Sequence, residues 1–308
     1  MSTRLIPLLV TSFSLALAAC GGGEGFVSNT GHLELGITDA PVDSAEAVVI
    51  HVTSATLHGP DGDTTVNVLD PMTKTPGRDI DLLLLQGGQW TGLFDETVTA
   101  GHYSWIRLGL DLDQSYIQIA GAQHGLRCTS CETVGYRINR SFDVEPGGAT
   151  LALMLDFDVR KSITDPNGSA PEYILRPTVR LIESAASGAI SGTVDATLIS
   201  SLGGGDCNVY VYSGHNAQPD DVYIPIDTAV PDTQNNPVTT AKVATDGTHA
   251  YTAAFLPAGE YTLAVTCDAA NDPAANDDTL TFSAALNASV VAGATATANF
   301  PASAPVVQ

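Results

Sequence analysis

Basic residues are scarce in this chain of 308 residues. Lys and Arg together number 12, against 34 Asp and Glu, so the formal net charge is −22 at pH 7. Such an acidic chain repels the phosphates of nucleic acids and the headgroups of anionic lipids. We therefore expect no nucleic-acid partner.

The usual catalytic motifs are missing as well. The sequence contains no HExxH zinc motif, no GxSxG nucleophile motif, no P-loop and no dinucleotide fingerprint, and its seven histidines are dispersed. We therefore expect a non-enzymatic structural or adhesive surface module without a resident cofactor. The alternative is a module that binds calcium or a glycan, for which Trp90 and Trp105 are candidate stacking residues. The protein or glycan partner stays unidentified.

One long apolar run stands at the start of the chain. It extends from Leu5 to Leu17 after Arg4 and leads into LAAC-G, which ends at Cys20 and Gly21. This pattern is typical of a secretory signal peptide, and no later run reaches the roughly 18 apolar residues of a membrane helix. The alternative, an ordinary signal peptide with an incidental cysteine, is disfavoured, because small residues directly before a cysteine are a demanding pattern.

The LAAC-G segment resembles the bacterial lipobox. The resemblance implies cleavage after residue 19, a diacylglycerol on the thiol of Cys20 and a fatty acid such as palmitate on the new amino terminus. Two or more acyl chains hold a protein on a bilayer, so we expect the membrane as a partner through Cys20. Gly21 stands where an inner-membrane retention signal prefers Asp, which favours the outer membrane of the bacterial cell envelope.

The rest of the chain predicts an all-β protein with two antiparallel β-sandwich domains. Apolar and polar residues alternate in short runs between turns rich in Gly, Pro, Asn and Asp. Residues 79–88 are the exception, because periodicity does not distinguish a strand from a short helix there. We divide the chain into a signal peptide (1–19), the lipidated cysteine with a flexible tether (20–31), a first domain (32–183), a linker (184–188), a second domain (189–301) and a tail (302–308).

Several ordered blocks resemble a known family. The first domain is similar to domain-of-unknown-function family 4382 of bacterial lipoproteins and exported proteins, through ITDAPVD (37–43), IDLLLLQGG (80–88), AGHY (100–103), LDFDVRKS (155–162) and YILRPTVRLI (173–182). The second domain resembles the carboxypeptidase-regulatory-like, or transthyretin-like, β-sandwich through its opening ISGTV and its LPAGEYTL block. Neither resemblance implies a reaction; the second implies a structural or binding module.

The remaining four cysteines form two pairs in the sequence. Cys128 and Cys131 make a CxxC, while Cys207 and Cys267 lie in two predicted strands. Disulfides are expected in an exported chain. A redox-active CxxC normally opens a helix, a setting that this segment lacks, and a zinc site at the pair would find only His124 as a neighbouring ligand.

Carboxylates suggest the remaining candidate sites. Asp268, Asp272, Asp277 and Asp278 crowd one segment, and calcium prefers such oxygen ligands, although the spacing is not that of an EF-hand and plain loops have similar compositions. Two further pairs lie on one face of a strand, Asp111 with Asp113 and Asp156 with Asp158. We expect them to form ion pairs with the nearby Arg107 and Arg160 rather than to act as acid and base.

Overall fold

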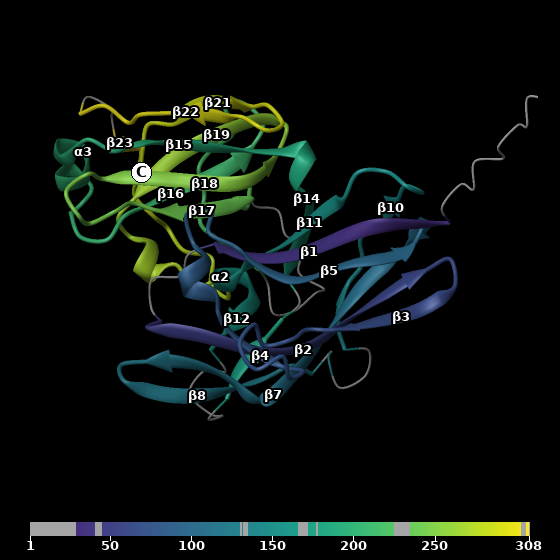
Figure 1. The fold of residues 1–308 in the computed structure, drawn as a ribbon. Coiled ribbons are helices and arrows are strands. Elements are labelled where there is room, and N and C mark those ends of the chain that lie inside the picture. The colour runs from purple at the N-terminus through teal and green to yellow at the C-terminus, as the bar shows by residue number, and fades with distance from the viewer. Residues whose placement is uncertain are drawn as a thin grey trace, which may run out of the picture.

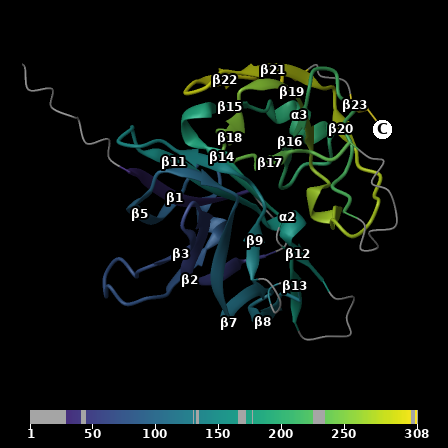
Figure 2. The same ribbon diagram turned by 90° about the vertical axis from the view of Figure 1, so that its right-hand side faces the viewer.

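The computed structural model describes residues 29–40, 45–129, 131, 135–165, 172–176, 178–224, 235–302 and 306–307. These residues form two β-rich domains, and the N-terminal domain is drawn below the C-terminal domain in Figures 1 and 2. The all-β class is confirmed. Each domain has its own apolar core, one made from residues between Leu33 and Leu175 and the other from residues between Ile190 and Phe300.

The first domain packs two sheets around one core. The four-stranded sheet has the order β14 (Val179–Glu183), β11 (Leu151–Asp158), β1 (Thr30–Ala40), β5 (Thr91–Thr99). The larger sheet has the order β12 (Ile163–Thr164), β13 (Tyr173–Leu175), β8 (Ala122–Arg127), β7 (Trp105–Ile119), β2 (Ala47–Gly59), β3 (Gly62–Asn67), with β4 (Arg78–Asp81) on β2 and β9 (Tyr136–Ile138) on β7. The short strands β6 (Gly101–Tyr103) and β10 (Phe142–Val144) pair with each other.

Strand alternation explains which residues enter this core. Leu33, Leu35 and Ile37 of β1 are fully buried, because alternate residues of a strand point to the same face. β1 pairs antiparallel with β5 but parallel with β11, so not every ladder of the sandwich is antiparallel. The parallel pairing brings the end of β1 beside the end of β11.

The apolar segment at 79–88 contains both a strand and a helix. β4 leads directly into a 3₁₀ helix, η1 (Leu82–Leu85), whose leucines 82 and 85 are buried. The carboxylate of Asp81 accepts hydrogen bonds from the backbone N–H of Leu83 at 3.1 Å and of Val48 at 3.2 Å. Because an N-cap side chain satisfies a free N–H at a helix start, Asp81 ends the strand and begins the helix.

The second domain follows with almost no spacer. β14 passes through η2 (Ser184–Ala186) into β15 (Ser187–Thr193). One sheet has the order β18 (Ala250–Pro257), β15, β22 (Thr295–Thr297), and the other has the order β17 (Thr239–Lys242), β16 (Asn208–Ser213), β19 (Gly259–Thr266), β21 (Leu286–Val290). The other elements are α3 (Ala196–Ser201), η3 (Ala269–Asn271), and the paired strands β20 (Phe282–Ser283) and β23 (Val306–Val307).

Strand β16 is buried on both faces. Val209 and Val211 enter the main core, whereas Tyr210 and Tyr212 point to the opposite face and belong to a separate apolar cluster. That cluster includes Val222 and Phe282, which come from the segments that cover this face of the sheet. A strand with apolar residues on both faces needs a covering layer on each, and here the second layer consists of loops.

Candidate functional site at the boundary between the domains

A short helix carries basic residues from the first domain to the second. Strand β11 ends at Asp158, whose side chain accepts a hydrogen bond from the backbone N–H of Lys161 at 3.2 Å and caps α2 (Val159–Ser162). The cap turns the chain away from the sheet directly after the buried Phe157. Helix α2, which contains Arg160 and Lys161, therefore leaves β11 at the side where the second domain lies (Figure 1).

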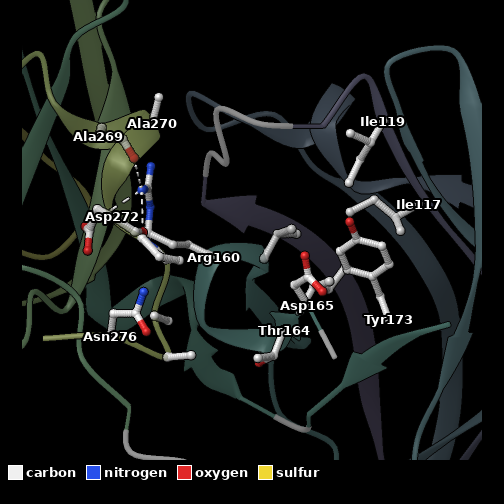
Figure 3. Close-up of a pocket in the computed structure, with 15 residues that line it drawn as sticks. Ile117, Ile119, Arg160, Thr164, Asp165, Tyr173, Ala269, Ala270, Asp272 and Asn276 are labelled. Atoms are coloured by element: carbon white, nitrogen blue, oxygen red, sulfur yellow. Dashed lines mark hydrogen bonds and ion pairs between the residues drawn. The ribbon is translucent and has the colours of Figure 1, made fainter. Parts of the chain in front are cut away.

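Arg160 is buried against the second domain, with 5% of its surface exposed. Its Nη1 donates to the carbonyl oxygens of Ala269 at 2.6 Å and Asp272 at 3.3 Å. The same nitrogen lies 3.7 Å from a carboxylate oxygen of Asp272, and the guanidinium stands 5.8 Å from the ring centre of Tyr210. Figure 3 shows the contacts of Arg160 with Ala269 and Asp272, which reach from α2 to the segment 269–272.

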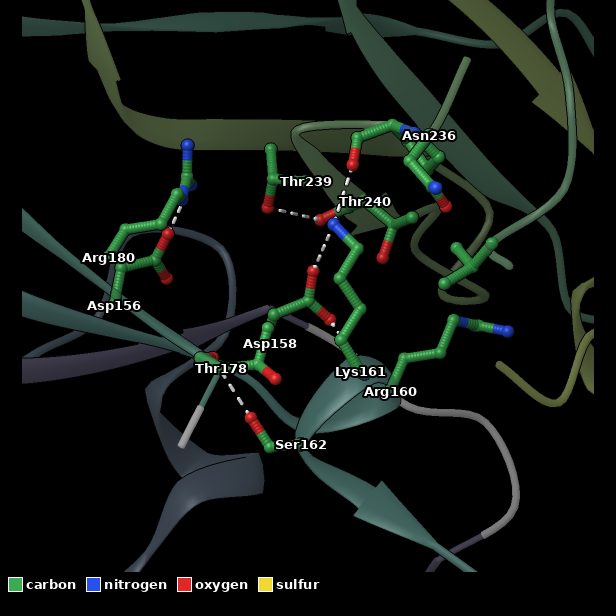
Figure 4. Close-up of polar contacts among 12 residues, drawn as sticks. Asp156, Asp158, Arg160, Lys161, Ser162, Thr178, Arg180, Asn236, Thr239 and Thr240 are labelled. Atoms are coloured by element: carbon green, nitrogen blue, oxygen red, sulfur yellow. Dashed lines mark hydrogen bonds and ion pairs between the residues drawn. The ribbon is translucent and has the colours of Figure 1, made fainter. Parts of the chain in front are cut away.

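Lys161 makes a second polar connection between the domains. Its Nζ lies 2.8 Å from a carboxylate oxygen of Asp158 and donates to the carbonyl oxygen of Pro237 at 2.5 Å (Figure 4). Both side chains of the ion pair are largely buried. The motif LDFDVRKS therefore supplies contacts to the second domain as well as core residues to the first.

Asp156 and Asp158 form ion pairs, but with other partners than the sequence predicts. Asp156 pairs with Arg180 across β11 and β14, and Asp158 pairs with Lys161, so the expected partner Arg160 was wrong. The reason is that the second domain covers this face of β11 and draws Arg160 toward its own carbonyl groups. Burial raises the pKa of Asp156, and the positive charge of Arg180 opposes that rise.

The predicted partner of the other carboxylate pair was also wrong. Arg107 lies 3.6 Å from a carboxylate oxygen of Asp63 on the neighbouring hairpin. Asp111 instead accepts hydrogen bonds from the side chain of Gln114 at 2.7 Å and the backbone N–H of Asp113 at 3.1 Å. These hydrogen bonds, led by that of Gln114, lower the pKa of Asp111. The carboxylate of Asp111 thus stabilises the irregular stretch at 111–115 within β7.

A cavity of about 460 Å³ lies beside Arg160, between the domains (Figure 3). Ile117, Ile119, Ile163 and Tyr173 form its wall on the first domain, and residues of the segment 269–276 form the opposite wall. Its polar lining includes Arg160, Thr164, Asp165, Asp272 and Asn276. Mostly apolar walls with a few polar groups are usual for sites that hold small molecules.

Next to this cavity, three carboxylates of the second domain converge. Asp221, Asp272 and Asp278 each offer an oxygen, and these oxygens lie within 4.8 Å of one another. Asp221 comes from the loop after β16, while Asp272 and Asp278 belong to the segment after η3. Both segments cover the Tyr210 and Tyr212 face of the sheet.

Hydrogen bonds fix the positions of two of the three carboxylates. Asp272 accepts from the hydroxyl of Tyr210 and from the backbone N–H of Val222 at 3.1 Å. Asp221 accepts from the backbone N–H of Asp278 at 2.6 Å. Tyr212 holds the same loop, since its hydroxyl donates to the carbonyl oxygen of Asp220 at 2.5 Å. The two segments are thus connected through their acidic residues.

The electrostatic environment of this cluster disfavours ionised carboxylates. Burial, together with the negative charges of Asp272, Asp220 and Asp277, raises the pKa of Asp221 to about 6 against the lowering effect of the Asp278 hydrogen bond. Burial also raises the pKa of Asp272, which the Tyr210 hydrogen bond and Arg160 partly offset. The cluster holds more negative charge than its protein partners neutralise.

The sequence found part of this cluster. Of the four predicted metal ligands, Asp272 and Asp278 belong to it. Asp268 instead accepts from the backbone N–H of Thr281 at 3.2 Å, and Asp277 is exposed. Asp221 was missed because it lies 51 residues before Asp272 in the sequence. Only the packing of its loop over β16 brings Asp221 near Asp272 and Asp278. The neighbouring Asp220 was the one feature of the sequence that could have indicated an acidic site in this loop.

The structure joins the four described cysteines into two disulfides. Cys128 is bonded to Cys131, and Cys207 is bonded to Cys267. The second disulfide connects β16 and β19 at their paired ends, next to the Asn208–Thr266 register position. His124 packs its ring edge-on against Tyr173, with ring centres 5.5 Å apart, rather than completing a metal site at the CxxC. Cys20 lies outside the described residues.

The two tryptophans differ in their availability for stacking. Trp105 is 9% exposed, because His58 stacks on its ring and the guanidinium groups of Arg107 and Arg137 lie 5.1 and 4.6 Å from its centre. Trp90 is 46% exposed. Of the two candidate stacking residues, Trp90 alone presents a substantial surface.

Within the described ranges, no helix is long and apolar enough to cross a membrane. No curated protein matches the sequence significantly. Among solved structures, the Bacillus anthracis TIE protein matches at 11% identity with a TM-score of 0.19, over 88% of this chain and 33% of its own, so the chain spans about a third of that protein.

Two further solved structures are similar at the same level. GBS52, the minor pilin of Streptococcus agalactiae, matches at 9% identity and a TM-score of 0.20, over 87% of this chain and 94% of its own. A fimbrial protein from Bacteroides ovatus matches at 10% identity and a TM-score of 0.20, over 90% and 49% of the two chains. These scores are low, so no function follows from them.

The family comparison concerns the first domain. The matched segment begins with β1 and ends after β13, and it includes Arg160 and Lys161, which contact the second domain. The resemblance of the second domain to carboxypeptidase-regulatory-like domains remains a prediction. Residues 30–177 match the family model described as "Domain of unknown function (DUF4382)", as the ordered blocks of the sequence predict.

Proposed function

We propose that this protein is a lipid-anchored component of the bacterial cell envelope and acts there as a non-enzymatic structural or adhesive module. Cys20 is the acylated residue, the following segment is the tether, and the two β-sandwich domains form the presented part. The outer membrane is the proposed location, because Gly21 rather than Asp follows the cysteine.

The observation that carries the proposal is the buried polar contact between the domains. Arg160 donates to the carbonyl oxygens of Ala269 and Asp272, and Lys161 donates to that of Pro237. Separating the domains would leave these donors and acceptors without their partners. An unpaired buried polar group costs free energy of folding. A spacer of one 3₁₀ turn restricts hinge motion further. This arrangement suits a protein that presents a surface at a fixed distance and orientation.

The burial of the CxxC disulfide argues against the thiol–disulfide enzyme. An exchange enzyme needs a reactive thiolate, typically at a helix N-terminus. The CxxC lies between strand β8 and a helical position at Cys131, whose carbonyl oxygen accepts from the backbone N–H of Gly135, so the expectation of a setting without a helix was wrong. Cys128 is 1% exposed and Cys131 is partly buried, which hinders attack by an external thiol. A structural role of this disulfide is the proposal that its surroundings support.

Metabolic labelling with a palmitate analogue tests the anchor. We expect wild-type protein to carry the label and to fractionate with the outer membrane, and the Cys20→Ala variant to lose both properties. The Cys128→Ala/Cys131→Ala double variant is the matched control, since it removes cysteines without touching the lipobox. Unlabelled wild-type protein, or equal labelling of the Cys20→Ala variant, would refute the anchor.

Protease treatment of intact cells tests presentation at the surface. Digestion of the domains in intact cells supports an adhesive surface module, whereas digestion only after the outer membrane is opened places the module in the periplasm. Recovery of the wild-type protein in the soluble fraction would contradict both forms of the proposal.

A further inference from the structure

The cluster of Asp221, Asp272 and Asp278 has the dimensions of a cation site. Calcium binds oxygen ligands at about 2.3–2.6 Å, so two ligands on opposite sides of one ion are separated by about 5 Å. The three carboxylate oxygens lie within 4.8 Å of one another, and one ion can therefore contact all three.

A buried oxygen without a partner provides an independent indication. Asp221 is fully buried, and its Oδ1 has no hydrogen-bond partner among the described residues. The buried Oδ2 of Asp278 is also unpartnered there. Buried polar atoms in proteins are normally satisfied, and an unsatisfied carboxylate oxygen is especially costly because it carries charge. A cation bound among the three carboxylates is a partner that such oxygens can take.

The charges of the surrounding groups lead to the same conclusion. Among the described residues, Arg160 forms an ion pair with the cluster, at 3.7 Å from Asp272. Asp220 and Asp277 add negative charge close to Asp221. Three ionised carboxylates and one guanidinium leave a net charge of −2, which one divalent cation neutralises.

We propose that Asp221, Asp272 and Asp278 bind a divalent cation, with calcium as the preferred ion. Calcium accepts flexible, oxygen-rich coordination, and Asp278 is partly exposed, so water can complete the ligand set on its side. The ion connects the loop after β16 to the segment after η3, over the Tyr210 face of the sheet. It also stabilises the carboxylate that Arg160 contacts from the first domain. The proposal is independent of the lipid anchor.

Calorimetric titration of the full-length protein in detergent with CaCl₂ tests the site. We expect one ion per chain with a Kd near the 10⁻⁴–10⁻³ M of extracellular modules. At ten times the Kd, the thermal midpoint should rise by about 3–6 °C above that measured with chelator. MgCl₂ should give a smaller rise, because magnesium requires stricter octahedral geometry.

Two neighbouring substitutions form a matched pair. Asp278→Asn should weaken calcium binding about tenfold or more, because it removes a charged ligand. Asp277→Asn makes the same change at an exposed position outside the cluster and should leave binding nearly unchanged. Equal losses in the two variants would indicate general attraction to an acidic surface and would overturn the site.

A third variant keeps the test decisive if Asp278→Asn does not fold. Asp221→Asn removes the charge of the unpartnered carboxylate while its amide oxygen can still accept from the N–H of Asp278. We expect this variant to lose calcium binding yet to unfold at a higher temperature than wild type in chelator. Absence of calcium heat and of any midpoint shift in folded wild-type protein would refute the proposal.

Discussion

Replacement of Arg160 by Met tests how far the two domains depend on each other. Met retains most of the aliphatic volume of the arginine stem, so the substitution removes mainly the guanidinium and its interactions. It deletes the donor to Ala269 and Asp272 and the ion pair at 3.7 Å. The carboxylate of Asp272, whose residue is 2% exposed, then lies without its compensating charge.

The expected loss is about 3–5 kcal/mol of unfolding free energy at pH 7.5. Removing one partner of a buried ion pair typically costs this much, and hydrogen bonds to charged groups contribute about 1.5–3 kcal/mol each within that total. Protonation of Asp272 limits the loss, because burial already raises its pKa. The difference between variant and wild type should therefore shrink as the pH falls.

Urea denaturation in the presence of a chelator measures the effect. Arg140→Met is the control, because Arg140 is exposed and surface substitutions usually change stability by less than about 0.5 kcal/mol. Adding Asp272→Asn to the Arg160→Met background should recover part of the loss, since it removes the uncompensated charge. If Arg160→Met unfolds like the Arg140→Met control, the buried contact does not stabilise the connection between the domains.

Two further predictions follow from the second domain. Replacing both Cys207 and Cys267 by Ala should lower its unfolding free energy by about 2–5 kcal/mol, because the bond closes a long loop of the unfolded chain; urea titration of oxidised wild type and variant measures the difference, and equal midpoints would contradict it. In chelator, Asp221→Asn should exceed wild type in stability at pH 7.5, and the difference should shrink as the pH falls and become small near pH 4, where Asp221 is protonated in the folded state and increasingly in the unfolded state. The pKa of Asp221 is raised from 3.8 to about 6 in the folded state. The stability that its proton gives the folded state is therefore complete at pH values below the unfolded-state pKa, and it is lost as the pH rises through 6. Thermal unfolding between pH 4 and 7.5 measures this trend, and a pH-independent difference would refute it.

Local sequence patterns predicted the interior of the first domain well. The alternation of Leu151, Leu153, Leu155 and Phe157 placed these residues on one face of a strand, and β11 extends over them. Such a pattern depends only on the period of a strand. The ordered blocks likewise predicted the segment that the family model matches, residues 30–177.

Local patterns did not reveal what covers the other face of β11. Asp156, Asp158 and Arg160 look like residues of a solvated face, yet each is at most 6% exposed. The second domain buries them, and no period of the strand encodes that contact. Their ion-pair partners were wrong for the same reason, because Arg180 and Lys161 are chosen by sheet register and by the turn into α2.

For the candidate cation site, too, local sequence predicted one part and tertiary structure decided the other. The composition of residues 268–278 indicated carboxylate ligands for calcium, and two of the four predicted residues belong to the cluster. The third member comes from a distant loop that packs over Tyr210 and Tyr212. The packing of that loop buries Asp221 completely, whereas Asp277, which the sequence also predicted as a ligand, is exposed.

The sequence by itself determined the β-rich class, the absence of the common catalytic motifs and the lipobox-like start that places Cys20 at a proposed anchor. These features depend on composition, on short periods and on a linear motif. Tertiary structure alone decided that Arg160 and Lys161 connect the domains and that Asp221 meets Asp272 and Asp278. The physical reason is that buried charge is tolerated only beside its partners, and those partners are brought together by folding rather than by sequence distance.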